Sequence, residues 1–256
     1  MIELNAVYSF SQVPYITYDV LEDYAMKLMF DFCPELVNNP GVLNVDEFLE
    51  YYLRLTVDFR RLCYNKKVLG ITAFNDGMVD IIDDAGQPDQ LPVRTGTVII
   101  DNSLTRKQSE PRLRFTMMHE GGGHWLLHRR AFAKDNPFGP AGIYANQYIA
   151  AKAGNGDYLR NQKERNDIER MERQADFLAS ALLMPKDALR EVFKEFFRFY
   201  GERPGRIIRG RSQMDDCFAA QLPEYVAQTF NVSQKAALIR LEKLTAIVGK
   251  GWGYGF

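Results

Sequence analysis

The sequence is poor in cysteine and in net charge, and each shortage excludes a class of function. Its 256 residues include three cysteines, at positions 33, 63 and 217, and no Cys-x-x-Cys pair. Thiols scattered in this way argue against a disulfide framework or a zinc cage built from thiolates, and they fit a reducing compartment. The formal net charge is −1, so the chain lacks the general positive field that attracts nucleic acid.

Long hydrophobic runs are absent as well. No apolar stretch approaches the roughly 20 residues of a membrane-spanning helix, and residues 1–11 lack the basic start and apolar run of a signal peptide. We therefore expect a cytoplasmic protein with no membrane partner. The apolar fraction of 46% and the charged fraction of 25% are ordinary for a globular protein. The length allows one large core or two small domains.

The order of the predicted elements in the first half of the chain indicates an α+β fold. Apolar residues at helical spacing predict a helix over 18–33. Asn44, with Glu47 three residues later, predicts the capped start of a shorter helix. Runs rich in β-branched and aromatic residues predict strands over 55–59, 68–74 and 97–101. Helices followed by a group of strands favour α+β over a parallel, alternating fold.

A tight hairpin is predicted in the middle of this strand region. The tripeptide Asn75-Asp76-Gly77 is a strong turn signal, so the strand over 68–74 should pair with a returning strand over 78–82. Residues 83–92 should then form a loop.

The second half of the chain is predicted to be largely helical. Helices are expected over about 111–130, 162–184, 186–200 and, on both sides of a short turn at 231–233, over 222–247. A long, irregular loop is expected over 131–160, and an exposed basic connector over 202–212.

All three histidines of the chain fall within ten residues of one predicted helix, at His119, His124 and His128. Imidazole nitrogens and carboxylate oxygens suit Zn²⁺, and a catalytic zinc site keeps one position for water. The metal lowers the pKa of that water toward neutrality, and a nearby carboxylate can then take its proton. The cluster therefore predicts a metal site with a hydrolytic function.

The spacing of the first two histidines departs from the usual helical zinc motif. In H-E-x-x-H the histidines are four residues apart and share one helix face, and the glutamate is the general base. Residues 119–124 are His-Glu-Gly-Gly-Gly-His, which is one residue longer. At about 100° per residue, a spacing of four leaves an offset of about 40°, whereas a spacing of five leaves about 140°.

Three hypotheses account for the extra residue. In the first, the glycines absorb it in a π-type turn, so that His119 and His124 both face the metal. In the second, the helix is regular, and Glu120, His124 and His128 share a face that holds the metal. In the third, the site has lost its metal. Three glycines inside a helix cost about 2–3 kcal/mol relative to alanine, an unusual choice for packing alone. The first hypothesis is favoured, and all three stay open.

Two segments of the chain resemble the ImmA/IrrE family of zinc metallopeptidases. The family pattern R-F-T-x-x-H-E-x-G-H-x-x-x-H is similar to residues 114–128, apart from the extra glycine. A second pattern, E-x-x-A-[ND]-x-F-A-x-x-L-L-M-P, is similar to residues 172–185. The segments stand in the family order, roughly 45 residues apart. With weaker matches elsewhere, the resemblance covers roughly residues 18–130 and 162–247.

The resemblance implies an α+β, zincin-like metallopeptidase core with a small antiparallel or mixed sheet and an active-site helix, followed by a C-terminal helix-turn-helix-like element. Carried over by position, it implies Zn²⁺ as the cofactor, bound by His119, His124 and Glu172, with Glu120 as the general base. The expected divisions are a peptidase domain (1–185), a helical connector (186–215), the helix-turn-helix-like element (216–248) and a glycine- and aromatic-rich tail (249–256).

Two further polar residues lie close to these positions in the sequence. His128 follows His124 by four residues, and we expect it to orient a ligand rather than to bind the metal. Asp176 is one helical turn after Glu172, so it should either hydrogen-bond a ligand or face water. Without the resemblance, Glu172 itself would be expected on a solvated helix face, because charged residues surround it.

The implied function is zinc-dependent cleavage of a protein substrate, with helix-turn-helix transcriptional repressors as the substrate class. Two alternatives stay open: an inactive or metal-free pseudo-peptidase that binds proteins, and a regulator that binds DNA. Nucleic acid is the less favoured partner, because the last predicted helix offers only a thin basic face of Lys235, Arg240 and Lys243.

Overall fold

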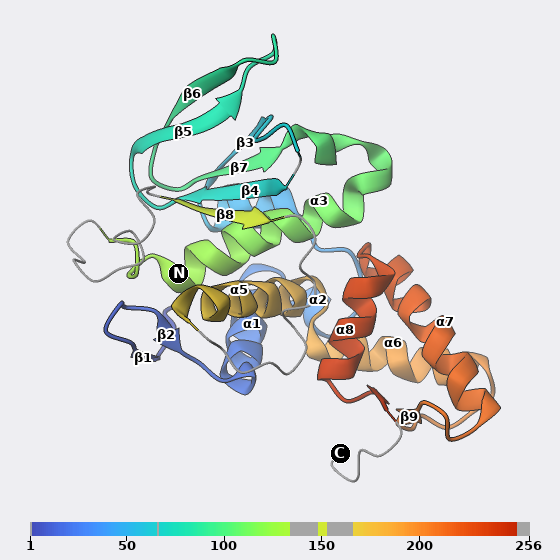
Figure 1. Cartoon of the computed structure of the whole chain (residues 1–256). Helices are drawn as coiled ribbons and strands as arrows, with labels where there is room; N and C mark the ends of the chain where they lie inside the picture. The colour runs from blue at the N-terminus through green and yellow to red at the C-terminus, as the bar shows by residue number, and fades with distance from the viewer. Residues whose placement is uncertain (1, 66, 134–147, 153–165, 250–256) are drawn as a thin grey trace. The chain divides into compact units, whose positions relative to one another are not determined.

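The computed structural model describes residues 2–65, 67–133, 148–152 and 166–249 (Figure 1). The chain divides into two compact units: the first comprises Met1–Leu28 and Asn44–Leu182, and the second Met29–Leu43 and Leu183–Phe256. Most of the predicted loop over 131–160 and nearly all of the tail over 249–256 lie outside the described residues. Among the described residues, no helix is long and apolar enough to cross a membrane.

The first unit contains a four-stranded mixed sheet with the order β3-β7-β4-β8. Its strands are β3 (Thr56–Arg60), β7 (Thr97–Asp101), β4 (Val68–Ala73) and β8 (Tyr148–Lys152). β3 runs parallel to β7, whereas β4 is antiparallel to both β7 and β8. Every residue of β7 is buried, as its apolar sequence predicts. The three strands expected over 55–59, 68–74 and 97–101 are therefore present, and the α+β class is confirmed.

The predicted hairpin is wrong, and so is the loop predicted after it. β5 (Gly77–Ile82) pairs with β6 (Pro88–Val93) in a separate two-stranded sheet, not with β4. Asp76 does not close a two-residue turn, because its carboxylate accepts hydrogen bonds from the backbone N (2.7 Å) and Oγ1 (2.9 Å) of Thr95. The prolines of β6 are tolerated because its outer edge needs no donors. β8 likewise corrects part of the loop predicted over 131–160.

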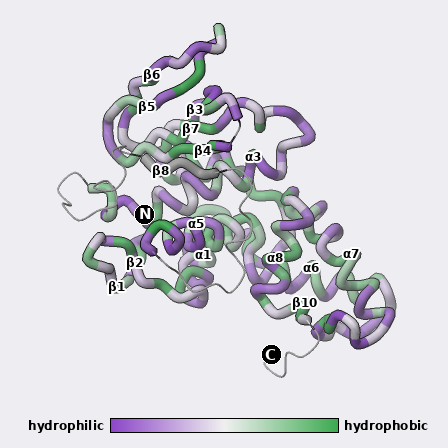
Figure 2. Tube along the Cα trace, in the orientation of Figure 1, coloured by the Kyte–Doolittle hydropathy of each residue, from purple (hydrophilic) through white to green (hydrophobic). Residues whose placement is uncertain are grey.

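The helical segments of the first unit include α1 (Tyr18–Phe32), η1 (Glu47–Tyr52), η2 (Asn102–Thr105), η3 (Lys107–Ser109), α3 (Glu110–Met117), η4 (Met118–Trp125), α4 (Leu126–His128) and α5 (Asp167–Leu183). Of these, α3 and η4 contact β4, and η1 contacts β3. Asn44 accepts a hydrogen bond from the Glu47 backbone N at 3.2 Å, as the cap prediction requires. Figure 1 shows the helix through α3 and η4 running below β4, with α5 beside that helix. Hydrophilic and hydrophobic residues alternate along α5 (Figure 2), so its apolar stripe can pack inward. A hairpin of β1 (Val7–Tyr8) and β2 (Pro14–Tyr15) precedes these elements.

The second unit is mainly helical. It contains α2 (Glu35–Asn38), α6 (Lys186–Phe199), α7 (Gln213–Phe230) and α8 (Gln234–Lys243), with the short parallel pair β9 (Ile207–Ile208) and β10 (Ile247–Val248). The predicted helix, turn and helix over 222–247 are present, but α7 begins earlier, inside the expected connector. Asn231 ends α7 in the left-handed conformation (φ 50°), and Ser233 caps α8. The expected division at 185 and 215 stays a prediction.

Arg240 bears on the DNA-binding alternative. It is only 1% exposed, and its guanidinium donates to the carbonyl oxygen of Met184 at 3.1 and 3.2 Å. One of the three basic residues that the alternative relies on therefore faces the interior of the second unit.

Candidate metal centre

The helix that carries the histidines changes its winding at the extra glycine. The regular α3 is followed by eight residues of π-helix, η4, before α4 resumes the α-helical pattern. The rings of His119 and His124 lie edge to face with centroids 4.6 Å apart, so both point to the same side. The predicted π-type turn is confirmed, and the hypothesis of a regular helix is wrong.

Packing explains why glycine occupies residues 121–123. A Cβ atom on Gly121 would lie 2.4 Å from Cδ2 of Leu49, and one on Gly122 would lie 2.8 Å from Cε of Met118. A Cβ atom on Gly123 would lie 2.7 Å from Cα and 2.9 Å from the carbonyl oxygen of Ala175. The backbones of η4 and α5 therefore touch at Gly123, which brings Glu172 on α5 close to the histidines.

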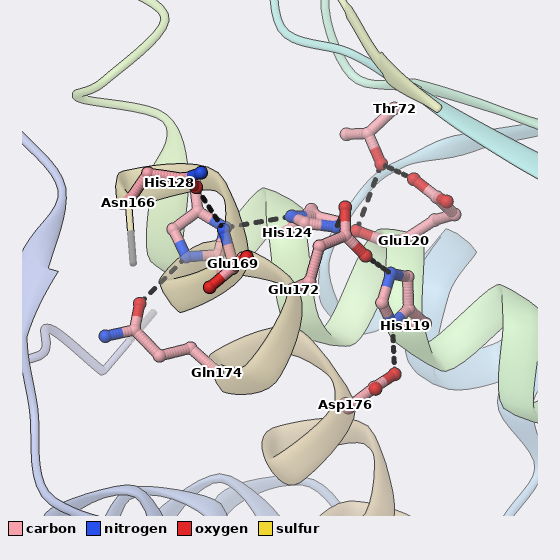
Figure 3. A network of polar contacts seen from close by, with 10 residues as sticks. All are labelled: Thr72, His119, Glu120, His124, His128, Asn166, Glu169, Glu172, Gln174 and Asp176. Atoms are coloured by element: carbon pink, nitrogen blue, oxygen red, sulfur yellow. Dashed lines mark hydrogen bonds and ion pairs between the residues drawn. The ribbon is translucent and has the colours of Figure 1, made fainter. Parts of the chain in front are cut away.

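Three potential ligand atoms converge between η4 and α5 (Figure 3). His119 Nε2 lies 3.4 Å from Oε2 of Glu172, and His124 Nε2 lies 3.6 Å from Oε1 of the same carboxylate. The cluster of His119, His124 and Glu172 has one ligand atom from each residue within 4.8 Å of the others. Ligands about 2.0–2.1 Å from a tetrahedral zinc lie about 3.4 Å from one another. The spacing therefore fits a zinc ion better than it fits direct hydrogen bonds.

The two inward nitrogens are buried and make no hydrogen bond within the described part of the chain. Buried polar atoms without a hydrogen bond are rare and call for a partner such as an ion. An imidazole nitrogen from each of two histidines and one carboxylate form a donor set that suits zinc and leaves room for a water ligand. These residues thus fit the metal that the sequence predicts.

Asp176 orients His119. Its Oδ1 lies 2.8 Å from Nδ1 of His119, so Nε2 of the ring is left to face Glu172. Burial lowers the pKa of His119, but the hydrogen bond to Asp176 and the nearby carboxylates of Asp176 and Glu172 outweigh it and raise the pKa well above its ordinary value. The surroundings of His119 therefore favour positive charge, whether a proton or a metal ion supplies it.

His124 and His128 are held in the neutral form. Burial, followed by the neighbouring charges of His119 and His128, lowers the pKa of His124 well below its ordinary value. Burial also lowers the pKa of His128 to about 3, although Gln174 opposes that shift. His128 does not point at Glu172; its Nδ1 lies 2.9 Å from Nδ1 of His124. This arrangement agrees with the expectation that His128 orients a ligand.

Glu120 lies beside the donor cluster and packs against the sheet. Its side chain is fully buried, and Oγ1 of Thr72 on β4 contacts both its carboxylate and, at 3.2 Å, its carbonyl oxygen. A Cβ atom on Gly70 would lie 2.7 Å from Cγ of Glu120. Sequence reasoning missed Thr72 and Gly70, because nothing in the local pattern of β4 indicates which helix crosses it.

The chain matches the sequence profile of the peptidase family described as IrrE N-terminal-like domain over residues 95–242, more than half of its length. The matched region contains both histidine ligand candidates, Glu120 and Glu172. No curated protein matches the chain.

Proposed function

Because the chain belongs to the ImmA/IrrE family of peptidases, we propose that it is a zinc-dependent endopeptidase. The zinc ligands are His119, His124 and Glu172, and the general base is Glu120. The observation that carries the proposal is the convergence of three ligand atoms within 4.8 Å, two of them buried nitrogens that form no hydrogen bond with any residue that the structure describes. When bound, zinc would act as a Lewis acid and provide an activated water at neutral pH.

The protein's own residues supply binding and proton transfer. His119 and His124 present Nε2, and Glu172 adds one negative charge that matches a divalent cation. Glu120 accepts a proton at a carboxylate oxygen and later returns it to the leaving amine. Thr72 fixes that carboxylate by a hydrogen bond, which reduces the motion that proton transfer would otherwise have to overcome.

The proposal extends to substrate and compartment. The substrate is a protein, and the family resemblance implies helix-turn-helix transcriptional repressors as its class. The cytoplasm is the proposed compartment, because Cys33, Cys63 and Cys217 form no disulfide among the described residues and thiols persist where the environment is reducing.

Metal analysis with two matched variants tests this function. We expect the purified protein to hold about one zinc per chain and to cleave an unfolded protein substrate. Glu172→Ala should lose zinc, because it removes an anionic ligand. Glu120→Gln should keep zinc and lose cleavage, since the amide cannot accept the proton.

Each contrary result points to a different alternative. A protein that neither holds zinc nor takes it up on addition would contradict the metal site. Bound zinc without cleavage would favour a protein-binding pseudo-peptidase. Loss of zinc from Glu120→Gln would make Glu120 a ligand, and salt-dependent binding to DNA would favour the regulator.

A further inference from the structure

A chain of hydrogen bonds runs from His124 to the N-terminal hairpin. Nδ1 of His124 lies 2.9 Å from Nδ1 of His128, and Nε2 of His128 lies 3.0 Å from Oε1 of Gln174. Nε2 of Gln174 then donates to the carbonyl oxygen of Pro14 at 2.7 Å. His124 and His128 have no exposed surface, and Gln174 has 3%, so water does not compete for these bonds.

The carbonyl of Pro14 determines the direction of every bond in the chain. A backbone carbonyl can only accept, so the amide nitrogen of Gln174 must face it and the amide oxygen must face His128. That oxygen also only accepts, so Nε2 of His128 carries a proton. No carboxylate of the described residues bonds to His128, so the buried ring is neutral and its Nδ1 is an acceptor.

The bond between His128 and His124 then determines which nitrogen of His124 carries the proton. Because Nδ1 of His128 accepts, Nδ1 of His124 must carry the proton. A neutral imidazole has one proton, so Nε2 of His124 is left with a lone pair directed at Glu172. We propose that His128, Gln174 and the Pro14 carbonyl form a relay that positions His124 and fixes it in the tautomer that binds metal. The inference builds on the proposed function, but the tautomer itself does not depend on zinc.

The relay that orients His124 is neutral, whereas the residue that orients His119 is a carboxylate. His119 is oriented by the carboxylate of Asp176, whereas His124 is oriented through a neutral ring, an amide and a peptide carbonyl. The Nδ1 atom of His119 thus has a negatively charged partner, whereas Nδ1 of His124 has a neutral one. A neutral relay fixes the second ring without adding another negative charge near the cation, which would weaken its electrophilic character.

Nuclear magnetic resonance of the zinc-free, full-length protein tests the tautomer directly. The chain has three histidines, so nitrogen-15 labelling of histidine gives three rings, assigned by replacing one residue at a time. Measured near pH 8, above the usual histidine pKa of about 6.5, the proton should lie on Nδ1 of His124 and on Nε2 of His128. A proton on Nε2 of His124 would overturn the proposal.

Gln174→Met tests the positioning role. The substitution keeps the length of the side chain but removes both of its hydrogen bonds, so the tautomer of His124 should become mixed. Zinc affinity, measured by competition with a chromophoric chelator, should fall about tenfold to a hundredfold. Gln228→Met, at an exposed position of α7, is the matched control and should change neither property.

The outcomes separate the relay from the proposed function. An unchanged tautomer and unchanged zinc affinity in Gln174→Met would refute the relay. If that variant fails to fold, the spectrum of the unaltered protein still decides between the two tautomers of His124. A protein that shows the expected tautomers but binds no zinc would refute the proposed function and leave the relay standing.

Discussion

Thr72 is the residue through which the sheet holds the proposed general base. Its hydroxyl has one proton to donate, and the two oxygens of Glu120 that it contacts belong to the carboxylate and to the peptide carbonyl. Because Thr72 has no exposed surface, water cannot replace its hydroxyl. The position of Glu120 therefore depends on a side chain 48 residues away in the sequence.

Thr72→Val should separate catalysis from metal binding. Valine keeps the shape of threonine but cannot donate, and a hydrogen bond to a charged group contributes about 1.5 kcal/mol or more. We expect kcat/KM to fall about tenfold while zinc affinity stays constant. Thr72→Ser retains the hydroxyl and should keep most of the activity. Equal losses in both variants would assign Thr72 a packing role only.

At the scale of single residues, the sequence predicts the candidate metal ligands well, but it does not predict the residues that position them. The clustering of the histidines points to His119 and His124, the family resemblance implies Glu120 and Glu172, and the structure brings His119, His124 and Glu172 to one place. Gln174 stands inside the same motif as Glu172, yet its role depends on a carbonyl 160 residues away. Local patterns do not encode such pairings.

Among the elements, η4 and α5 are coupled by contact between their backbones. A Cβ atom at Gly123 would overlap Cα, Cβ and the carbonyl oxygen of Ala175, none of which can rotate away. At Gly122 the nearest atom is the end of the flexible Met118 side chain. The two neighbouring glycines should therefore differ sharply in their tolerance of a methyl group.

Gly123→Ala should push α5 away from η4. We expect a loss of about 2–3 kcal/mol in the free energy of unfolding, as for other overpacked cores, together with weaker zinc binding because Glu172 moves with α5. Gly122→Ala should stay within about 1 kcal/mol of the unaltered protein, since alanine also favours helix. Urea unfolding and zinc competition measure both effects. Similar losses in the two variants would contradict the assigned contact.

A carboxylate at the start of α7 makes a pH-dependent contribution to the stability of the second unit. Asp215 accepts hydrogen bonds from Arg211 at 2.6 and 2.7 Å and from Ser212 at 2.8 Å. Burial raises its pKa, but these bonds, one from the Ile208 backbone and the charge of Arg211 outweigh burial and hold the pKa below its ordinary value. A carboxyl group with a depressed pKa stabilises the folded state only when it is ionised.

Asp215→Asn should therefore destabilise the protein at neutral pH but not in acid. The ionised Asp215 carboxylate stabilises the folded state fully above its pKa in the unfolded chain, about 3.9. This stabilisation is lost as the pH falls through the lower pKa of the folded state. We expect a deficit of about 1 kcal/mol at pH 7, typical of a negative charge near a helix N-terminus. Urea unfolding at neutral and acidic pH measures it, and a deficit that grows in acid would contradict the assignment.

The elements themselves could be predicted where their signals are local. Helix starts at Asn44 and Ser233, the apolar strand β7 and the turn at Asn231 follow from neighbouring residues. The pairing of β5 with β6 could not be predicted, because the turn signal at Asp76 is redirected to Thr95, 19 residues away. The strand β6 is not predicted, because its two prolines argue against a strand, although an edge strand tolerates them.

On the scale of the whole molecule, the three proposed zinc ligands all belong to the first unit. His119 and His124 are close in sequence, but Glu172 lies on α5, 48 residues after His124. Bound metal would therefore add a further connection between segments that are already joined by the hydrogen bonds His119–Asp176 and His128–Gln174. Binding that occurs only in the folded state adds to stability by mass action.

Removal of zinc should lower the melting temperature of the intact protein. Zinc at a thousandfold excess over its Kd adds about 4 kcal/mol to the free energy of unfolding. For a chain of this size, that change raises the melting temperature by about 10 °C. Calorimetry with and without a chelator measures the shift. Glu172→Ala is the control, and its melting temperature should not respond to the chelator. A chelator response of equal size in that variant would place the stabilising metal elsewhere.

The bond between Gln174 and the carbonyl of Pro14 spans 160 residues. This separation determines how late in synthesis the site can be completed. Ribosomes add about 5–20 residues per second, so Gln174 is joined to the chain roughly 10–30 s after Pro14. Glu172 and Gln174 follow His124 by about 50 residues, so for roughly the last 2–10 s of that interval the histidines exist without Glu172 and without the amide that fixes the tautomer of His124. The nascent chain therefore has no complete site with which to capture metal or to act on its neighbours until α5 has emerged and folded back.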